Sequence, residues 1–551
     1  MSRHDRIVQG RELVVAVPPS LLTRLWQGLG IGRKPPIRLL AVPRDPIAGD
    51  KAAGADLLDG IFEVGGKAFA PEAIDPGTGH QDKAAWERLQ DFSWLRDLAA
   101  AATPERGREV AEALTRIWLA GMEGKEEGPA WRPDLWGRRL LFWPAYAPYL
   151  LASRDSAYRA GLLRLMVGGA RHIEKTGDRS RLGLPRIAAW SGAVSAALLV
   201  QSLNGRLNRC ETGLQRAIRS GLGDDGGLLS RVPMEQGELV ELLALLRASY
   251  ATSMRGMPEW LEEAQDGALA CLLSVTGPDG SLSSWQGGHP GKASRIAAAI
   301  AGATLGETPA PRARSWGYQR LQSKEVVLIL DAAPPPTAKQ RAGASASTLA
   351  FELSDGPQRL IVNCGGGDHL PDELRHLLRS TAAHSTLVLG DTNSTAILEN
   401  GGLGRGVEEV TLERGSRDGQ PLLEASHDGY VRRFGLVHHR ELLLAADGKA
   451  LNGADALIAR GKTGKVPLAF LLRFHLAPGV EVIRTADGRG ALLRMRGKKA
   501  WQFKVRGALV EAEDSLWIDG DGQPRTTQQL AVSGESPPEG MTISWELKRA
   551  G

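Results

Sequence analysis

The pattern of hydrophobic and polar positions changes once along the chain, close to residue 310. From about residue 86, apolar side chains recur at i, i+3, i+4 and i+7, which predicts a series of amphipathic helices. After about residue 320, short apolar and β-branched runs replace them, for example at 326–330, 349–353 and 468–476. Asp-Gly pairs between such runs favour tight hairpin turns. The pattern predicts a helical first half followed by antiparallel β-sheets.

A chain of 551 residues is too long for one hydrophobic core, so more than one domain is expected. We predict an irregular or helical extension at 1–85, a helical domain at 86–310 and a β domain at 311–551. Substantial sheet between residues 90 and 300 would contradict this division.

The amino-acid composition excludes some classes of protein but does not indicate a function. Charged residues make up 24% of the chain, and 68 basic against 63 acidic residues give a net charge of +5. This small surplus suits an anionic ligand, but no dense Lys/Arg block indicates nucleic-acid binding. The three cysteines match neither zinc-site spacing nor a disulfide framework. The apolar patch at 13–17 is too short for a signal peptide, and no run approaches a membrane span, so we expect a cytoplasmic protein.

Six phrases, taken in order, resemble the heparinase II/III-like family of polysaccharide lyases, particularly its signal-less bacterial branch. They are 92–98 (FSWLRDL), 316–321 (WGYQRL), 348–356 (TLAFELSDG), 383–387 (AHSTL), 427–430 (HDGY) and 473–476 (RFHL). The resemblance implies an α+β multidomain fold, with an incomplete (α/α) toroid followed by an antiparallel β-sandwich. It also implies β-elimination of a uronate-containing acidic polysaccharide, heparin-, heparan- or alginate-like, in a cleft between the domains.

The resemblance bears on cofactor and location as well. Family members are commonly periplasmic or in the cell envelope, which differs from the cytoplasmic expectation above. No cofactor is expected. A structural divalent metal in the β domain fits the family, but the sequence offers no ligand set for it. The oligomeric state is left open.

Elimination needs a base for the C5 proton, a group that neutralises the carboxylate and an acid for the leaving oxygen. His384 matches the strand-head histidine of the family and is the candidate base, because an imidazole titrates near neutral pH. The alternative is a structural histidine that caps a strand. Tyr250 is the candidate acid, and its alternative is a core tyrosine on an amphipathic helix.

Three positions depart from the family pattern. Where the family often has Asp-Gly-Gly-His-x-Ser-Arg-Asn-Pro, residues 225–233 here are DGGLLSRVP. Leu228 therefore replaces a histidine, Val232 replaces an amide and Ser345 replaces a second histidine. Leu and Val neither donate hydrogen bonds nor transfer protons. The alternative to a working lyase is thus a catalytically impaired protein that binds an anionic glycan or cell-envelope polymer. If activity is lost only through these replaced side chains, Val232→Asn combined with Ser345→His should raise it.

Further residues are candidates for binding the substrate by charge, hydrogen bonds or ring stacking. They are Arg231, Ser230, Trp131, Trp136, His438 and His439. Arg231 could hold a carboxylate in place of the lost amide. The tryptophans could stack on sugar rings or pack in the core. Only one of two neighbouring strand residues faces a given side, so at most one of the adjacent histidines should act. We expect His384, Arg231 and Tyr250 to face a shared groove.

Overall fold

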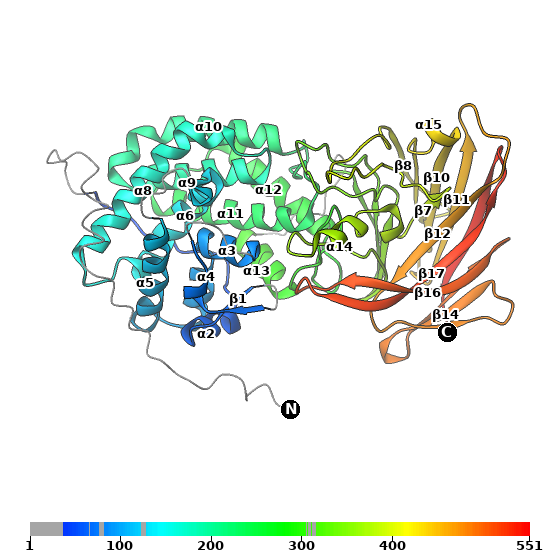
Figure 1. The fold of residues 1–551 in the computed structure, drawn as a ribbon, viewed down its shortest axis with the longest axis horizontal. Helices are drawn as coiled ribbons and strands as arrows, with labels where there is room; N and C mark the ends of the chain where they lie inside the picture. Colours follow the sequence, from blue (N-terminus) through cyan, green and yellow to red (C-terminus); the bar gives the residue numbers. More distant parts are fainter. Residues whose placement is uncertain are drawn as a thin grey trace.

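The computed structural model describes residues 37–64, 67–76, 82–122, 128–304, 306, 310 and 316–550. The predicted patch at 13–17 and most of the linker near 310 lie outside these residues. Two parts follow one another along the longest axis, a helical part and a β part (Figure 1). The predicted fold class, helices followed by antiparallel sheets, is therefore confirmed, and the domain bounds stay a prediction.

The helical part begins with a small unit from the predicted extension. It holds α2 (Lys51–Leu58) and the hairpin of β1 (Phe62–Val64) and β2 (Lys67–Phe69). The Asp50 side chain accepts hydrogen bonds from the backbone amides of residues 52 and 53, which satisfies the free N–H groups at the start of α2. This unit packs on the following helices, since α2 lies against α4.

Between residues 90 and 300 the described residues form helices and short 3-10 turns, with isolated bridges but no strand. The helices are α3 (Lys83–Asp91), α4 (Trp94–Ala101), α5 (Pro104–Gly121), α6 (Pro133–Ala145), α7 (Ala147–Leu150), α8 (Ser156–Thr176), α9 (Leu184–Leu199), α10 (Leu207–Gly221), α11 (Pro233–Thr252), α12 (Glu259–Ser274) and α13 (Ala293–Ala303). They form the helical toroid that the resemblance implies. Helix α9 lies at its centre, in contact with α6, α8, α10 and α11. Nearly all of its residues are buried, as expected for a central helix.

The β part contains two large antiparallel sheets that share one core. One sheet has the order β13-β14-β15-β18-β11-β10-β9-β8, and the other has β16-β17-β12-β6-β5-β4-β3, with β7 paired to β12. The strands are β3 (Tyr318–Ser323), β4 (Val326–Asp331), β5 (Phe351–Asp355), β6 (Gln358–Val362), β7 (Leu387–Leu389), β8 (Val410–Arg417), β9 (Gln420–His427), β10 (Leu436–Leu444), β11 (Ala450–Ala459), β12 (Leu468–Leu476), β13 (Glu481–Arg484), β14 (Gly490–Arg494), β15 (Ala500–Val505), β16 (Leu509–Ile518), β17 (Pro524–Ser536) and β18 (Gly540–Arg549). Two short helices, α14 (Asp372–Leu377) and α15 (Val431–Phe434), lie in connections of this sandwich.

The two parts meet along a junction that we call the seam. On the helical side it is formed by residues 225–233 and 284–287, and on the β side by residues 316–318, 331–334 and 345–348. The Trp316 indole fills the space beside Gly227, where an added Cβ would lie 2.2 Å from the ring. Trp316 Nε1 also donates to the Leu228 carbonyl at 2.8 Å. The seam is therefore closely packed, and it contains the positions at which elimination chemistry was expected.

Candidate functional site

Arg231 joins the two parts across the seam. It lies in the turn before α11 with φ of 56°, and its guanidinium forms a buried ion pair with Asp331 at the end of β4. The remaining donors reach backbone carbonyls of the β part, Trp316 at 3.0 Å and Pro334 at 2.8 Å. The guanidinium also lies over the Tyr318 ring, 4.7 Å from its centroid. Arg231 thus lies at the junction of the two parts with its guanidinium bound to the Asp331 carboxylate, and its role in binding a substrate stays a prediction.

Asp331 is the centre of a hydrogen-bonded network that the sequence did not reveal. It is fully buried and accepts from Ser347 Oγ at 2.7 Å and Gln286 Nε2 at 3.4 Å, besides Arg231. The Gln286 carbonyl oxygen in turn accepts from the Ser345 backbone amide at 2.9 Å. The one sequence signal for Asp331 is a charged residue that ends the otherwise apolar run at 326–331. Its partners are 100, 45 and 16 residues away, which no local pattern indicates.

The three departures from the family pattern lie inside this packed seam. Leu228 and Ser345 have no exposed surface, and Val232 is 3% exposed. The Leu228 amide donates to Gln236 Oε1 at 2.8 Å, which fixes the backbone of the 225–233 segment. The Ser345 hydroxyl has no hydrogen-bond partner among the described residues. At these positions no side chain presents a proton-transfer group to a ligand.

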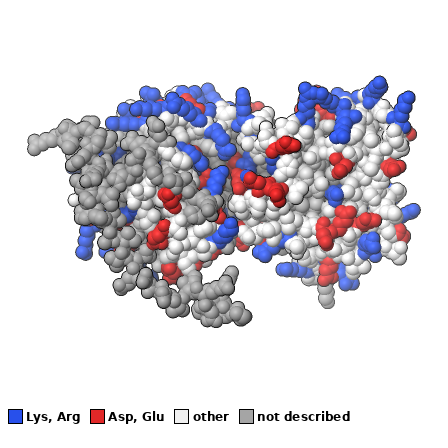
Figure 2. All heavy atoms as spheres, in the orientation of Figure 1, with Lys and Arg blue, Asp and Glu red and all other residues white. Residues whose placement is uncertain are grey.

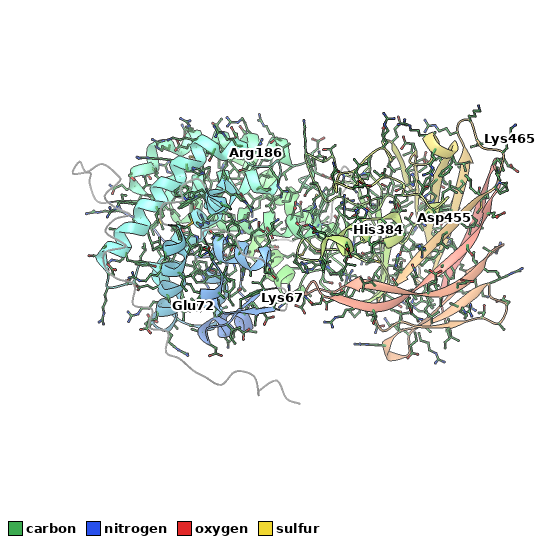
Figure 3. All side chains as sticks on the ribbon, in the orientation of Figure 1. Lys67, Glu72, Arg186, His384, Asp455 and Lys465 are labelled. Atoms are coloured by element: carbon green, nitrogen blue, oxygen red, sulfur yellow. The ribbon has the colours of Figure 1, made fainter. Side chains whose placement is uncertain are left out.

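His384 precedes β7 at the helical-facing end of the β part, where Figure 3 labels it. It is 2% exposed, and its Nδ1 donates to the Ser380 carbonyl at 2.7 Å, so Nε2 keeps the lone pair. Burial lowers the pKa of His384 to about 4, while the Ser380 carbonyl and Asp331 act in the opposite direction. The predicted groove shared by His384 and Arg231 stays a prediction. The imidazole is neutral at pH 7, but a base of such low pKa accepts a proton weakly.

Tyr250 does not belong to this site. It lies near the end of α11, 17 residues after Pro233, and at a rise of 1.5 Å per residue this is about 26 Å along the helix. Its hydroxyl donates to Glu211 Oε1 on α10 at 2.7 Å, and burial raises its pKa. The prediction of a groove shared with Arg231 and His384 is wrong for this residue, because the long straight helix separates them.

The two candidate tryptophans belong mainly to the helical core. Trp136 has no exposed surface and packs edge-on against Trp118 and Trp143, with centroids 6.1 Å and 5.9 Å away. Stacking on a sugar would require this aromatic cluster to open. Trp131 is half-buried, and its ring lies 5.0 Å from Trp136 and 5.3 Å from His172. The structure therefore places Trp136 as a packing residue.

The paired histidines of β10 point to opposite faces, as strand alternation requires. His438 has no exposed surface, and its Nε2 lies 2.7 Å from Asp455 Oδ1 inside the sandwich. The same carboxylate accepts from Arg440 Nε at 2.8 Å. His439 is half-buried on the other face. His438 thus belongs to a buried polar cluster within the sandwich, and Figure 3 shows Asp455 well inside the β part, away from His384.

Ser230 lies at the edge of the seam. Its hydroxyl donates to Glu235 Oε2 at 2.5 Å, and burial raises the pKa of Glu235. Glu235 also pairs with Arg341 of the β part at 3.3 Å. The serine thus supports a second contact between the two parts, and its predicted role in binding a substrate stays a prediction.

A hollow of about 1510 Å³ opens beside the seam, between α10, α12 and β3. Four carboxylates line it, Asp224, Asp225, Glu263 and Asp266, together with the arginines Arg219, Arg320 and Arg414. The mixture of signs does not resemble the positive cleft that attracts a polyanion. None of the residues predicted for catalysis or binding lines this hollow.

Within the described ranges, no group of three or more His, Cys, Asp or Glu side chains is arranged to hold a metal ion. The described residues thus offer no ligand set for the structural metal that the family allows, and that metal stays a prediction. In the same ranges no helix combines the length and apolar character needed to cross a membrane.

Comparisons with known proteins agree with the fold. Residues 306–546 match the family described as Heparinase II/III-like, C-terminal. The solved structure of Heparinase III has a TM-score of 0.66 at 14% identity, covering 91% of this chain and 85% of that one. Heparan sulfate lyase HepC from Pedobacter heparinus has a TM-score of 0.59 at 14% identity, covering 90% and 82%.

A curated protein is similar over nearly the whole length. FtsZ-localized protein C of Caulobacter vibrioides (strain NA1000 / CB15N) is 29% identical over 552 residues, 96% of this chain and 94% of that protein. The architecture is the toroid-and-sandwich fold of polysaccharide lyase-like proteins. The β part thus matches the Heparinase II/III-like C-terminal family, and the chain as a whole has the fold of the solved heparinases.

Proposed function

We propose that this protein is a heparinase-fold protein that has lost β-elimination and acts as a binding protein at the bacterial division site. One observation supports the proposed loss of β-elimination. The seam contains Leu228, Val232 and the Arg231–Asp331 ion pair where a lyase needs groups that transfer protons and bind a carboxylate. The name of the relative FtsZ-localized protein C supports the division site, because the similarity extends over both parts of the chain.

The electrostatics of the site support binding without turnover. Arg231 donates its hydrogen bonds to Asp331 and to backbone carbonyls. Few of its N–H groups are therefore free to bind a uronate carboxylate. His384 was predicted as the catalytic base, and its Nε2 lone pair is the observation that favours a working lyase as the second candidate. Losing one preorganised donor usually lowers a rate by about a hundredfold or more.

Activity is tested with heparin, heparan sulfate, alginate and other uronans, by following the ultraviolet absorbance of unsaturated products. We expect no product above background. We also expect none from Val232→Asn combined with Ser345→His. Both sites are buried in a seam closed by other residues, so two restored side chains do not open it. Product formation by the unmodified protein, abolished by His384→Ala, would establish the second candidate instead.

Location is tested with a fluorescent fusion of the full chain in a dividing bacterium. We expect the fusion to concentrate at the division site together with FtsZ and to disperse when FtsZ is depleted. The fluorescent protein alone serves as the control. A fusion that stays evenly distributed while the FtsZ ring is intact would rule out the division-site role.

A further inference from the structure

A second hollow, of about 350 Å³, lies at the junction of the two parts and shares no lining residue with the larger one. Its walls come from Gly287 of the helical part and from 341–343, 366–368, α14 with the following residues 378–379, and 399–401 of the β part. We call it the junction pocket. Figure 2 shows acidic and basic side chains gathered near the middle of the molecule, over this junction.

Arg379 is the unusual residue of the junction pocket. It is only 8% exposed, and its Nε donates to the Ala344 carbonyl at 2.8 Å. No carboxylate among the described residues forms an ion pair with it. Its Nη1 faces the opposite wall, 3.8 Å from the position that a Cβ on Gly401 would take. A buried guanidinium without a counter-ion is costly, so an anion supplied by a ligand would stabilise it.

The neighbouring cations are already neutralised. Arg341 pairs with Asp368 at 3.0 Å and with Glu235 at 3.3 Å, and Arg375 pairs with Asp372. Burial lowers the pKa of Arg379, and the positive charges of Arg341 and Arg375 lower it further. The exposed Glu399 lines the pocket without pairing with Arg379. Among the described arginines of the pocket, Arg379 is therefore the one without a carboxylate partner.

Five glycines in the walls of the junction pocket place no side chain in it. They are Gly287, Gly343, Gly366, Gly367 and Gly401. At Gly366 an added Cβ would lie 2.9 Å from the Gly287 Cα, so here the two parts touch backbone to backbone. Such walls leave the volume to a ligand and expose peptide groups to it. The volume is at the low end of small-molecule sites, which suits one sugar-sized unit rather than a polymer.

We propose that the junction pocket binds the oxyanion of a sugar-sized ligand, a carboxylate or a phosphate, and that Arg379 is the cation that recognises it. This site is separate from the seam positions discussed for elimination. It does not depend on where in the cell the protein acts, so its test and the tests above can fail independently.

Isothermal titration of the full-length protein with glucuronate, glucose 6-phosphate, inorganic phosphate and glucose tests the proposal. We expect at least one acidic probe to bind ten times more tightly than glucose. Glucuronate alone would identify a carboxylate ligand, and binding of the phosphate-bearing probes would identify a phosphate ligand. If no acidic probe binds more tightly than glucose, the proposal is wrong.

Two substitutions at one position give a matched control. Gly401 has φ of +79°, a conformation that Asp and Asn tolerate better than other residues. Gly401→Asp places a carboxylate beside Arg379 and should weaken binding of the acidic probe at least tenfold. Gly401→Asn adds the same bulk and backbone strain without the charge, and should bind within about threefold of the unmodified protein.

Equal binding by the Asp and Asn variants would overturn the role of Arg379. Should both variants fold poorly, Glu399→Gln provides an independent test, because this residue is exposed and forms no ion pair within the described residues. Removing its negative charge should tighten binding of the acidic probe severalfold. Unchanged or weaker binding by this variant would count against the proposal.

Discussion

At the scale of single residues, His384 shows how burial changes the chemistry of a side chain that a motif can locate. The sequence pattern predicted that a strand follows His384, and the structure has β7 at this place. The surroundings of His384 in the fold come from residues distant in sequence, such as Asp331 and His475, and no local pattern reports them. Tyr250 and Trp136 illustrate the same limit, because helical spacing marks apolar faces without showing which neighbour covers them.

The burial of His384 predicts a pH dependence of stability. Its pKa falls from the ordinary value of 6.5 to about 4 in the folded state, so the unfolded chain binds more protons between these values. The stabilisation is thus complete above pH 6.5 and is lost as the pH falls towards 4. For this residue we expect the free energy of unfolding to be about 2 kcal/mol lower at pH 5 than at pH 7.

Denaturant unfolding of the unmodified protein and of His384→Gln between pH 7 and 5 checks this dependence. The glutamine amide can donate to the Ser380 carbonyl and does not titrate, so the variant should lose less stability on acidification. His289 and His475, whose burial lowers their pKa values to about 4 and about 3, remain in the variant. Some of the slope therefore persists. Identical slopes for both proteins would show that His384 does not contribute.

At the scale of elements, two helices of the toroid meet through their backbones. Gly137 on α6 and Gly192 on α9 lie so close that a Cβ on Gly192 would stand 2.1 Å from the Gly137 carbonyl oxygen. The sequence predicted both helices from their apolar spacing, but which helices pair depends on this close approach. Glycines inside helices usually reduce stability, so a structural reason is expected at such positions.

This contact predicts opposite effects for two chemically identical substitutions. Gly192→Ala forces α6 and α9 apart and should lower the free energy of unfolding by about 1–3 kcal/mol. Gly168→Ala on α8, where an added Cβ meets no atom within 4 Å, should raise it by about 0.5–1 kcal/mol through better helix propensity. Denaturant titration of the two variants measures both values. A loss of the same size at both glycines would contradict the role of close packing.

At the scale of the whole molecule, the sequence correctly predicted helices followed by antiparallel strands, because periodicity is a local property. It also identified Leu228, Val232 and Ser345 as departures from lyase chemistry. What it could not provide is the network that closes the seam. Arg231 and Asp331 are 100 residues apart, and nothing near either residue indicates the other. The cation that the sequence proposed for a substrate carboxylate, Arg231, is paired with a carboxylate of the protein itself.

The buried ion pair across the seam predicts how the two parts unfold. Asp331→Asn leaves the Arg231 guanidinium buried without a counter-ion, which typically costs about 3–5 kcal/mol. Since this pair joins the parts, we expect calorimetry to show either a lower melting temperature or a split into two transitions. Asp521→Asn is the matched control, because the Lys292–Asp521 pair is about half exposed and should contribute less than about 1 kcal/mol. If the two substitutions destabilise the protein equally, the seam is held together by apolar packing rather than by this ion pair.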